Sequence, residues 1–207
     1  MLGATNSTFV MTNVDSWVDG TRAMVTVTNA IGENLWLGPG ELFVAPLAIT
    51  IPSSGSSGLA SRYPAIINVF GQPTNLASIA VSLWDLSHQH SADLNILLVS
   101  PSGTNIMLMS HAGSTNAVSH ANIVFQQWQP LPPESGPIPS ALTTSYSPSN
   151  YAQTNSLPNA PPGPYSSSLD DLWGTNPNGV WRMYIYDDKQ GGLGQLAGSW
   201  DLVLGFQ

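Results

Sequence analysis

The sequence predicts an all-β protein, on three observations. First, only 8% of the 207 residues are charged, while the chain holds 19 Gly and 17 Pro and is rich in Asn, Ser and Thr. Lys and Glu favour helices, whereas the residues that replace them favour strands and turns. Second, several segments alternate apolar and polar residues with the period of a strand. Third, no stretch has the period of a helix. The same composition is typical of an extracellular protein.

Charge and composition exclude several other classes of protein. With 42% apolar residues the chain can build a core, which a disordered chain cannot. Four Lys and Arg against twelve Asp and Glu give a net charge of −8, which disfavours nucleic acid and anionic membrane surfaces as partners. We expect no membrane-spanning segment and no signal peptide, because the apolar runs are too short and unflanked by basic residues. The absence of cysteine excludes a disulfide scaffold, a thiolate nucleophile and a zinc ribbon.

The first segment, residues 1–45, predicts three strands, at 8–14, 24–29 and 35–44. Three strands with one apolar face are only marginally stable alone. We therefore expect the segment to fold back on its own chain or to complete a sheet of an identical subunit by strand addition. The second arrangement is favoured, and it would build a head-to-tail filament or surface layer.

The second segment, residues 46–207, predicts a β-sandwich domain. Its expected strands are 65–69, 76–84, 94–99, 105–109, 123–125, 181–186 and 199–204. The turn sequence Ser100-Pro101-Ser102-Gly103 predicts a tight hairpin. The sequence therefore predicts two domains, 1–45 and 46–207.

An irregular stretch, residues 126–178, interrupts the strand pattern and holds 11 of the 17 prolines. Such long stretches are uncommon in compact domains, and they usually have a function or are fastened to the fold. Aromatic residues recur along it and argue against disorder. We expect the stretch to wrap the sandwich and to be fastened by these rings: Trp128, Tyr146, Tyr151, Tyr165 and Trp173.

Two stretches of the second segment resemble the proprotein convertase P domain. Residues 86–104, LSHQHSADLNILLVSPSGT, match the family's pattern of a His, an Asp-Leu pair, apolar alternation and Ser-Pro-x-Gly-Thr. Residues 178–187, NGVWRMYIYD, followed by Gly194 and by SWDL at 199–202, resemble its ending. The resemblance covers about 47–207 and implies a jelly-roll β-sandwich. Members of the family follow kexin- and furin-like subtilisin proteases or occur in large bacterial surface and secreted proteins.

The first segment resembles the last three strands of a bacterial immunoglobulin-like domain, over about 5–45. The resemblance rests on FVMTNV at 9–14, on Asp19 and on VTVTNAIG at 25–32. Ala23 stands where those domains have a tyrosine, and the earlier strands of such a domain are absent. The segment is thus interpreted as an immunoglobulin-like remnant or strand arm, with a β-rich linker as the alternative.

No catalytic residue is predicted. A serine hydrolase needs Ser, His and an acid that converge in space, and the chain has no Gly-x-Ser-x-Gly elbow. The resemblance points the same way, because the P domain carries no triad and its protease neighbour does.

The aspartates predict calcium. Most of them lie at strand ends or in loops, next to Asn, Ser and Gly, and calcium takes six to eight oxygen ligands from such groups. The P-domain resemblance also implies calcium sites. The alternative is that the aspartates only cap turns. The candidate ligands are Asp93, Asp187, Asp188, Asp85 and Asp171.

Histidine and tryptophan suggest two further kinds of site. His88 and His90 have strand spacing, and with His111 and His120 they are candidates for a transition-metal site, although structural hydrogen bonding is favoured. Among the tryptophans, those at core positions of the resemblance are expected to be buried, with Trp181 and Trp200 on neighbouring strands: Trp84, Trp181 and Trp200. The other four are candidates for a sugar-binding face: Trp17, Trp36, Trp128 and Trp173.

Together these features predict a non-enzymatic, extracellular or cell-surface module with a structural or adhesive role, stabilised by calcium. Its partners would be proteins, either other domains of the same polypeptide or identical subunits. The first alternative is an accessory P domain that stabilises the catalytic domain of a secreted subtilisin-like serine protease. The second alternative is a carbohydrate-binding module, with a glycan as its ligand.

Overall fold

The computed structural model divides the chain into two units, residues 1–46 and 47–207. The structure describes residues 22–28, 34–41, 48–52, 54–153 and 156–206. In unit 1 two strands are described, β1 (Arg22–Thr28) and β2 (Asn34–Glu41), which pair antiparallel with a bulge between Ala23 and Val25. The strand expected at 8–14 lies outside the described residues.

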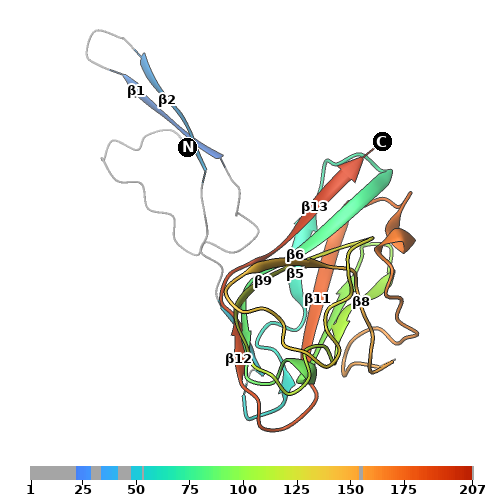
Figure 1. Cartoon of the computed structure of the whole chain (residues 1–207). Helices are drawn as coiled ribbons and strands as arrows, with labels where there is room; N and C mark the ends of the chain where they lie inside the picture. The colour runs from blue at the N-terminus through green and yellow to red at the C-terminus, as the bar shows by residue number, and fades with distance from the viewer. Residues whose placement is uncertain (1–21, 29–33, 42–47, 53, 154–155, 207) are drawn as a thin grey trace. The chain divides into compact units, whose positions relative to one another are not determined.

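Unit 2 is a β-sandwich, as the sequence predicts (Figure 1). Its six-stranded sheet consists of β3 (Ile49–Ile51), β6 (Leu76–His88), β9 (Val118–Gln126), β10 (Thr143–Tyr146), β12 (Gly194–Leu196) and β13 (Trp200–Phe206). Its five-stranded sheet consists of β4 (Gly58–Leu59), β5 (Ala65–Val69), β7 (Leu94–Val99), β8 (Asn105–Ser110) and β11 (Gly179–Asp187). The described residues contain two short 3₁₀ turns, η2 (Ser91–Asp93) and η3 (Leu169–Leu172), and no α-helix. None of their elements is a helix that could cross a membrane.

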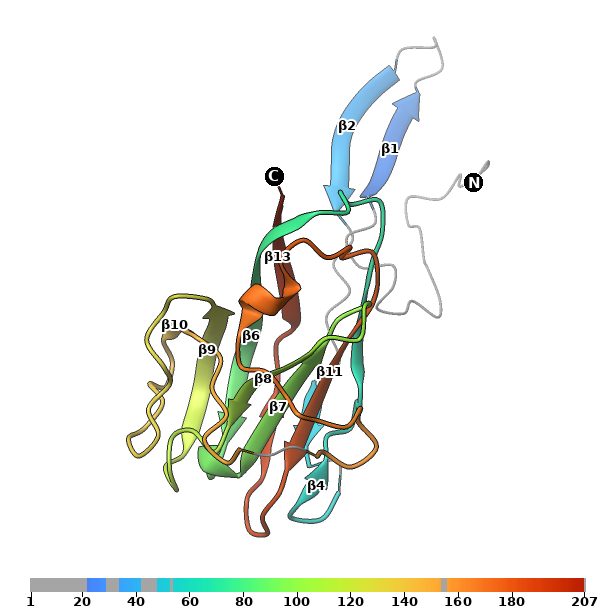
Figure 2. The same ribbon diagram turned by 90° about the vertical axis from the view of Figure 1, so that its right-hand side faces the viewer.

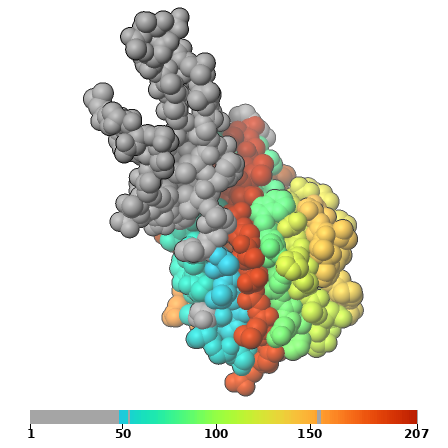
Figure 3. Space-filling view, turned by 90° about the vertical axis from the view of Figure 1, so that its left-hand side faces the viewer, coloured from blue at the N-terminus to red at the C-terminus, as the bar shows by residue number. Residues whose placement is uncertain are grey.

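The long strand β6 organises the six-stranded sheet. It pairs antiparallel with β9 on one side, and with β12 and then β13 on the other. β3 extends the sheet beyond β12, and β10 runs parallel to β9 at the opposite edge. Figure 3 shows this face of unit 2, with β3, the β12–β13 stretch, β6 and β9 side by side.

The five-stranded sheet is built around β11. β7 pairs with it on one side and connects to β8, while β4 and β5 both pair with its other side (Figure 2). The hairpin predicted at 100–103 joins β7 to β8. There Gly103 N donates to Ser100 O over 3.0 Å, and a φ of +88° suits glycine at that position.

The main core fills the space between the two sheets. Alternate residues of each strand point into it, such as Leu83 of β6, Phe125 of β9 and Ile96 of β7, and all three are fully buried. Trp181 and Trp200 are also buried, as predicted. They lie on β11 and β13, which belong to different sheets, so the expectation that their strands are neighbours is wrong.

Trp84 departs from its predicted place in the core. It is only half-buried, and its indole Nε1 donates a hydrogen bond to Asp201 Oδ2 on the neighbouring strand β13. A tryptophan ring whose N–H needs a partner is well satisfied at such a boundary position. The strand pattern around it is correct, but the side chain does not belong to the inward-facing set.

Part of the proline-rich stretch 126–178 covers the outer face of the five-stranded sheet. Its Leu157 and Tyr165 pack with Leu97, Val99 and Tyr184 in a second apolar cluster. Residues of β7 are therefore buried on both faces, which explains the uninterrupted apolar run of that strand. Part of the stretch forms β10 and η3, which the sequence pattern does not predict.

The expectation that aromatic rings fasten this stretch is confirmed for three of the five. Tyr146 and Tyr165 are buried, and the hydroxyl of partly buried Tyr151 donates to Pro132 O. It is wrong for Trp128 and Trp173, which are among the exposed large apolar side chains. The leucines of η3 and the backbone hydrogen bonds of the stretch do the fastening in their place.

Candidate functional site

Three of the predicted calcium ligands come together at one end of the five-stranded sheet. Asp93 ends η2 just before β7, and Asp187 ends β11, where it lies opposite Leu94 in the β7–β11 register. Asp188 follows directly, and its backbone N donates to Asp93 O over 3.0 Å. We call Asp93, Asp187 and Asp188 the acidic cluster.

Asp187 is the buried part of this cluster. Its side chain is fully buried, and its Oδ2 lies 3.4 Å from Nε2 of His88, which is equally buried. The backbone N of Lys189 donates to its Oδ1 over 3.2 Å. Burial raises the pKa of the Asp187 carboxyl, and nearby Asp93 acts in the same direction, while Lys189 N–H and His88 act against it.

The ring of His88 is held in place by glycines of the loop before β12. A Cβ on Gly192 would stand 2.8 Å from the ring, and one on Gly194 would stand 2.4 Å from it. On its other side the ring's Nδ1 lies 2.8 Å from the carbonyl oxygen of His90. The absence of side chains at Gly192 and Gly194 thus lets β12 and the loop before it approach His88.

Asp188 belongs to the outer face of the sheet. Its Oδ2 accepts a hydrogen bond from Asn95 Nδ2 at 3.1 Å and lies 2.7 Å from His111 Nε2. Asn95 is fully buried. Two oxygens here have no hydrogen-bond partner among the described residues, Asn95 Oδ1 and Asp188 Oδ1. Buried polar atoms are usually satisfied, so unpartnered oxygens on two side chains that touch each other require an explanation.

The other two predicted ligands lie elsewhere. Asp85 sits at an irregularity in the β6–β9 pairing with a φ of +60°, and its Oδ1 lies 2.7 Å from His120 Nδ1. Asp171 is exposed in η3, beside Asp170. Neither joins the acidic cluster.

The chemistry of the acidic cluster suits a calcium ion in part. Oxygens of carboxylates and amides are the ligands that calcium takes, and the unpartnered oxygens of Asn95, Asp187 and Asp188 are of this kind. Within the described residues, however, no three His, Cys, Asp or Glu side chains surround one point at which a metal ion could be held. A calcium ion here would therefore depend on Asn95, on backbone carbonyls and on water for most of its ligands.

Every histidine ring has an aspartate as its neighbour. Besides the pairs already described, His90 Nδ1 lies 3.5 Å from Asp93 Oδ2. His88 therefore contacts Asp187, and His90 contacts Asp93. The strand spacing of the two histidines would allow both to bind one metal ion, but their rings are paired with separate carboxylates. Nor does any of the four rings hydrogen-bond to a serine hydroxyl in the part of the chain that the structure describes.

The sequence pattern does not identify Asn95, and it marks His111 only as a candidate for a transition-metal site, not as a neighbour of the acidic cluster. Asn95 is the one polar residue of the strand LNILLV. A buried amide in an apolar strand indicates that a hydrogen-bonding partner lies close to it, because an unpaired buried amide is costly. His111 has no comparable signal, because its contact with Asp188 joins residues 77 positions apart.

The four tryptophans proposed for a sugar-binding face have different outcomes. Trp17 lies outside the described residues, and so does the side chain of Trp36. Trp128 and Trp173 are exposed, and both line the same groove on the six-stranded sheet.

One known family matches part of the sandwich. The family model of the proprotein convertase P-domain matches residues 76–129, which on the structure run from β6 to the residues just after β9. The resemblance read from the sequence is thereby confirmed over this stretch. P domains are non-catalytic modules of subtilisin-like proteases. No curated protein matches the chain.

Two solved structures resemble the chain at low identity. One is the serine protease of Aeromonas sobria in complex with a chaperone, with 17% identity and a TM-score of 0.36 over 89% of this chain. The other is the serine protease of Aeromonas sobria, with 16% identity and a TM-score of 0.35 over 87% of this chain. The chain spans 36% of the length of each. At these values the similarity establishes neither the fold nor the function.

Proposed function

We propose that unit 2 is a non-catalytic accessory P domain, and that it stabilises the catalytic domain of a secreted subtilisin-like serine protease. The observation that supports this most is the P-domain match over residues 76–129. These residues supply β6 and β9 to one sheet, and β7 and β8 to the other. The match therefore includes strands from both layers of the sandwich and the turns between them, and is not confined to one local motif.

The physical basis of such a role is linkage. A domain that binds the native catalytic domain and not its unfolded form stabilises it by about 2.7 kcal/mol when its effective concentration is 100 times the dissociation constant. Tethering within one polypeptide supplies effective concentrations of about millimolar without any free partner. Unit 2 suits this task because it has its own core and its sheets are complete without a contribution from β1 or β2. The family match favours this function over the structural or adhesive role.

We further propose that calcium binds at the acidic cluster and stabilises the sandwich. Asp187 and Asp188, with Asn95 beside them, would hold it, and the ion would compensate the charge that burial makes unfavourable at Asp187. Asp93 would contribute through its negative charge, in competition with Lys189, whose Nζ lies 3.9 Å from Asp93 Oδ1. Asp85 and Asp171 are not part of this proposal.

The accessory role is tested on the gene and on the secreted product. The reading frame that contains these residues should also encode a subtilisin-like domain with its own Asp, His and Ser. Deletion of residues 47–207 from that polypeptide should shorten the half-life of protease activity on heating by at least about tenfold, which corresponds to 1.4 kcal/mol. A reading frame without a protease domain, or an unchanged half-life after the deletion, would contradict the proposal.

A further inference from the structure

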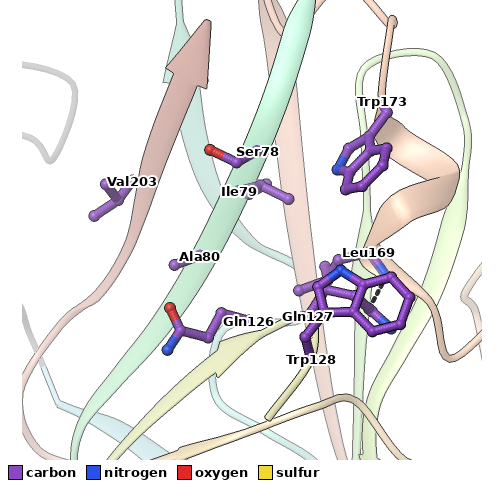
Figure 4. Close-up of a pocket in the computed structure, with 9 residues that line it drawn as sticks. All are labelled: Ser78, Ile79, Ala80, Gln126, Gln127, Trp128, Leu169, Trp173 and Val203. Atoms are coloured by element: carbon purple, nitrogen blue, oxygen red, sulfur yellow. Dashed lines mark hydrogen bonds between the residues drawn. The ribbon is translucent and has the colours of Figure 1, made fainter.

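A groove at the edge of β6, where its pairing with β9 ends, is explained neither by the P-domain role nor by the acidic cluster (Figure 4). It encloses about 270 Å³. Strands β6, β9 and β13, the loop after β9 and the η3 region contribute to it. Its lining residues are Ser78, Ile79, Ala80, Gln126, Gln127, Trp128, Leu169, Trp173 and Val203.

One side of the groove is a row of outward-pointing side chains on three paired strands. Ala80 of β6 lies opposite Val203 of β13 on one side and opposite Gln126 of β9 on the other. Residues directly opposite each other in paired strands point to the same face. Ser78 of β6 lies two residues from Ala80 on the same face, and its hydroxyl sits where a Cβ of Gly205 would be. This side of the groove therefore joins small apolar groups to an amide and a hydroxyl.

Two tryptophans line the opposite side of the groove: in Figure 4 their rings lie on the side of β6 to which Ile79 points, away from Ala80 and Val203. Trp128 follows β9 and is 78% exposed, and Trp173 follows η3 and is 50% exposed. Figure 4 shows both rings beside the same stretch of β6. Large rings are normally buried when the fold offers a place for them, and single exposed apolar side chains need no explanation. Two exposed indoles that line one groove do need one.

The backbone around both rings is firmly held. Gln129 N donates to Ser147 Oγ, whose hydroxyl in turn donates to Gln129 O over 2.7 Å, directly after Trp128. Trp128 itself has a φ of +66°, a conformation that a bulky residue rarely adopts. A costly backbone conformation that points a ring into solvent is an arrangement found at binding sites.

The second ring is held in a similar way. Trp173 N donates to Asp170 O, and the next residue, Gly174, donates to Leu76 O over 2.7 Å. Gln127 Oε1 accepts a hydrogen bond from Leu169 N at 2.9 Å, which ties the loop that carries Trp128 to the turn that precedes Trp173. The backbone segments that carry the two rings are thus held relative to each other before any ligand arrives, which lowers the entropic cost of binding.

We propose that this groove binds a neutral oligosaccharide, a function that goes beyond the accessory role. None of the nine lining residues carries a charge, so an ionic ligand would lose its solvation without compensation. The ring faces of the indoles suit the C–H faces of a sugar. A ligand that crosses the open edge of β6 would also meet Ser78, Gln126 and Gln127, whose hydroxyl and amide groups can hydrogen-bond to sugar hydroxyls. The volume is below the 300 Å³ or so at which pockets enclose a drug-sized molecule. One or two sugar rings would therefore lie in the groove, and the chain would continue over its open side.

A protein partner suits the groove less well. Specific protein interfaces bury about 1,200–2,000 Å² in total and have an apolar centre. Here the exposed large apolar side chains are Trp128, Trp173 and Val203, and Val203 lies with Ser78 and Gln126 on the opposite side of β6 from the two rings. The mixture of isolated rings with amides and hydroxyls matches a polyhydroxylated ligand, and it lacks a continuous apolar centre.

The test is isothermal titration calorimetry on the full 207-residue chain. The probes are the neutral β-linked hexasaccharides of glucose, xylose, mannose and N-acetylglucosamine, together with an oligogalacturonate as a charged control. At least one neutral probe should bind. Trp128→Ala and Trp173→Ala should each weaken the affinity for that probe at least about tenfold, the loss expected for one anchoring contact.

Phe70→Ala is the matched control, because Phe70 is 75% exposed and does not line the groove. Its affinity should stay within about twofold of the original, below the threshold of a significant contact.

Two further measurements keep the result unambiguous. Both tryptophan variants should melt within about 2 °C of the unaltered chain, because substitutions of exposed side chains rarely change stability by more than about 0.5 kcal/mol. Trp128→Phe should retain part of the affinity, since a smaller ring still stacks. The proposal is overturned if no neutral hexasaccharide binds, if both alanine variants bind as tightly as the original, or if only the charged probe binds. None of these outcomes bears on the accessory role, which is measured on protease half-life.

Discussion

Tyr63 and Tyr165 differ in whether the side-chain hydroxyl has a hydrogen-bond partner, and this difference should affect the stability of the fold. Tyr63 stacks edge-on against Tyr184 with ring centroids 4.9 Å apart, and its buried hydroxyl has no hydrogen-bond partner among the described residues. Burial and three neighbouring tyrosines raise its pKa. Tyr165 lies in the same apolar region, but its hydroxyl accepts from Leu157 N at 3.1 Å and donates to Pro161 O at 2.7 Å. The two side chains are therefore a matched pair for a test.

We predict that Tyr63→Phe leaves the free energy of unfolding unchanged or raises it by up to about 1 kcal/mol, because it removes an unsatisfied polar atom and keeps the ring. Tyr165→Phe should lower it by about 1–3 kcal/mol, because Leu157 N loses its buried acceptor. Urea denaturation followed by tryptophan fluorescence measures both. Equal losses in the two variants would mean that the Tyr63 hydroxyl has a partner in solution.

Asp187 gives a prediction that depends on pH. Burial raises the pKa of its carboxyl above the ordinary value of 3.8, so the folded protein binds the proton more tightly than the unfolded chain does. The stability that this provides is complete below about pH 3.8 and is lost as pH rises through the folded-state pKa. In EDTA, Asp187→Asn should therefore gain stability over the unaltered protein as pH rises, by at most about 1.4 kcal/mol per pH unit.

Calcium should reverse the order of stability, so that the unaltered protein becomes more stable than Asp187→Asn. With the ion at 100 times its dissociation constant, the unaltered protein gains about 2.7 kcal/mol, whereas the asparagine variant loses a charged ligand and gains less. Thermal melts at pH 4 and pH 7, in EDTA and in millimolar calcium, provide all four comparisons. Asp85→Asn is the control, because Asp85 pairs with His120 outside the acidic cluster. Identical melting temperatures with and without calcium would exclude a tight site at the acidic cluster.

At the scale of elements, the close approach of β12 to β6 depends on one residue without a side chain. Gly194 lies opposite His88 in the register, and a Cβ there would stand 2.3 Å from Ser87 O. Backbone atoms cannot yield to such a contact, so a side chain at this position has to push the two strands apart. The movement would also displace the His88 ring from Asp187.

We predict that Gly194→Ala lowers the free energy of unfolding by about 1–3 kcal/mol or more, the usual cost of overpacking. Gly136→Ala is the matched control. A Cβ there would meet only Pro133 Cβ at an ordinary 3.6 Å, so the change should be neutral or should stabilise by about 0.4–1 kcal/mol through the unfolded state. Denaturation midpoints compare the two. If Gly194→Ala proved as stable as Gly136→Ala, the β6–β12 register described here would be wrong.

The strands that the sequence predicts are those whose pattern is local. β5, β7 and β13 show apolar alternation or apolar runs of strand length, and each lies within two residues of its expected range. β10 and β12 were missed for a physical reason. β10 exists through its parallel pairing with β9, a contact between residues 21 apart, and β12 consists of only Gly-Gln-Leu held by β6 and β3. No local periodicity records such pairings.

The candidate sites, like the strands, could be predicted only where a local sequence pattern marks them. Acidic residues at strand ends identified Asp93, Asp187 and Asp188, because strand ends that pair also bring their flanking residues together. The same rule could not exclude Asp85 or Asp171, whose positions depend on a strand irregularity and on a 3₁₀ turn. Hydrophobicity alone misplaced Trp128 and Trp173, because it does not distinguish a ring that fastens a loop from one that a loop presents to solvent.

At the scale of the whole molecule, the two units differ in the interactions that stabilise each of them internally. Both sheets and both apolar clusters described for unit 2 are made by residues 47–207. In unit 1 the described strands form a two-stranded sheet, which is marginal in water without further strands or a packed face. The division at residue 46 and the strand-addition hypothesis both remain predictions, and one experiment addresses them together.

A chain of residues 47–207 should fold by itself, and its melting temperature should lie within about 3 °C of that of the full chain. If unit 2 is an independent domain, removing unit 1 changes its free energy of unfolding very little. Analytical ultracentrifugation of both chains then tests strand addition. If β1 or β2 completes a sheet of an identical subunit, the full chain should form concentration-dependent oligomers and the shortened chain should stay monomeric. Monomers in both cases would refute the filament hypothesis. A shortened chain that melts without cooperativity would show instead that unit 1 covers part of the sandwich, and the division into two independent units would then be wrong.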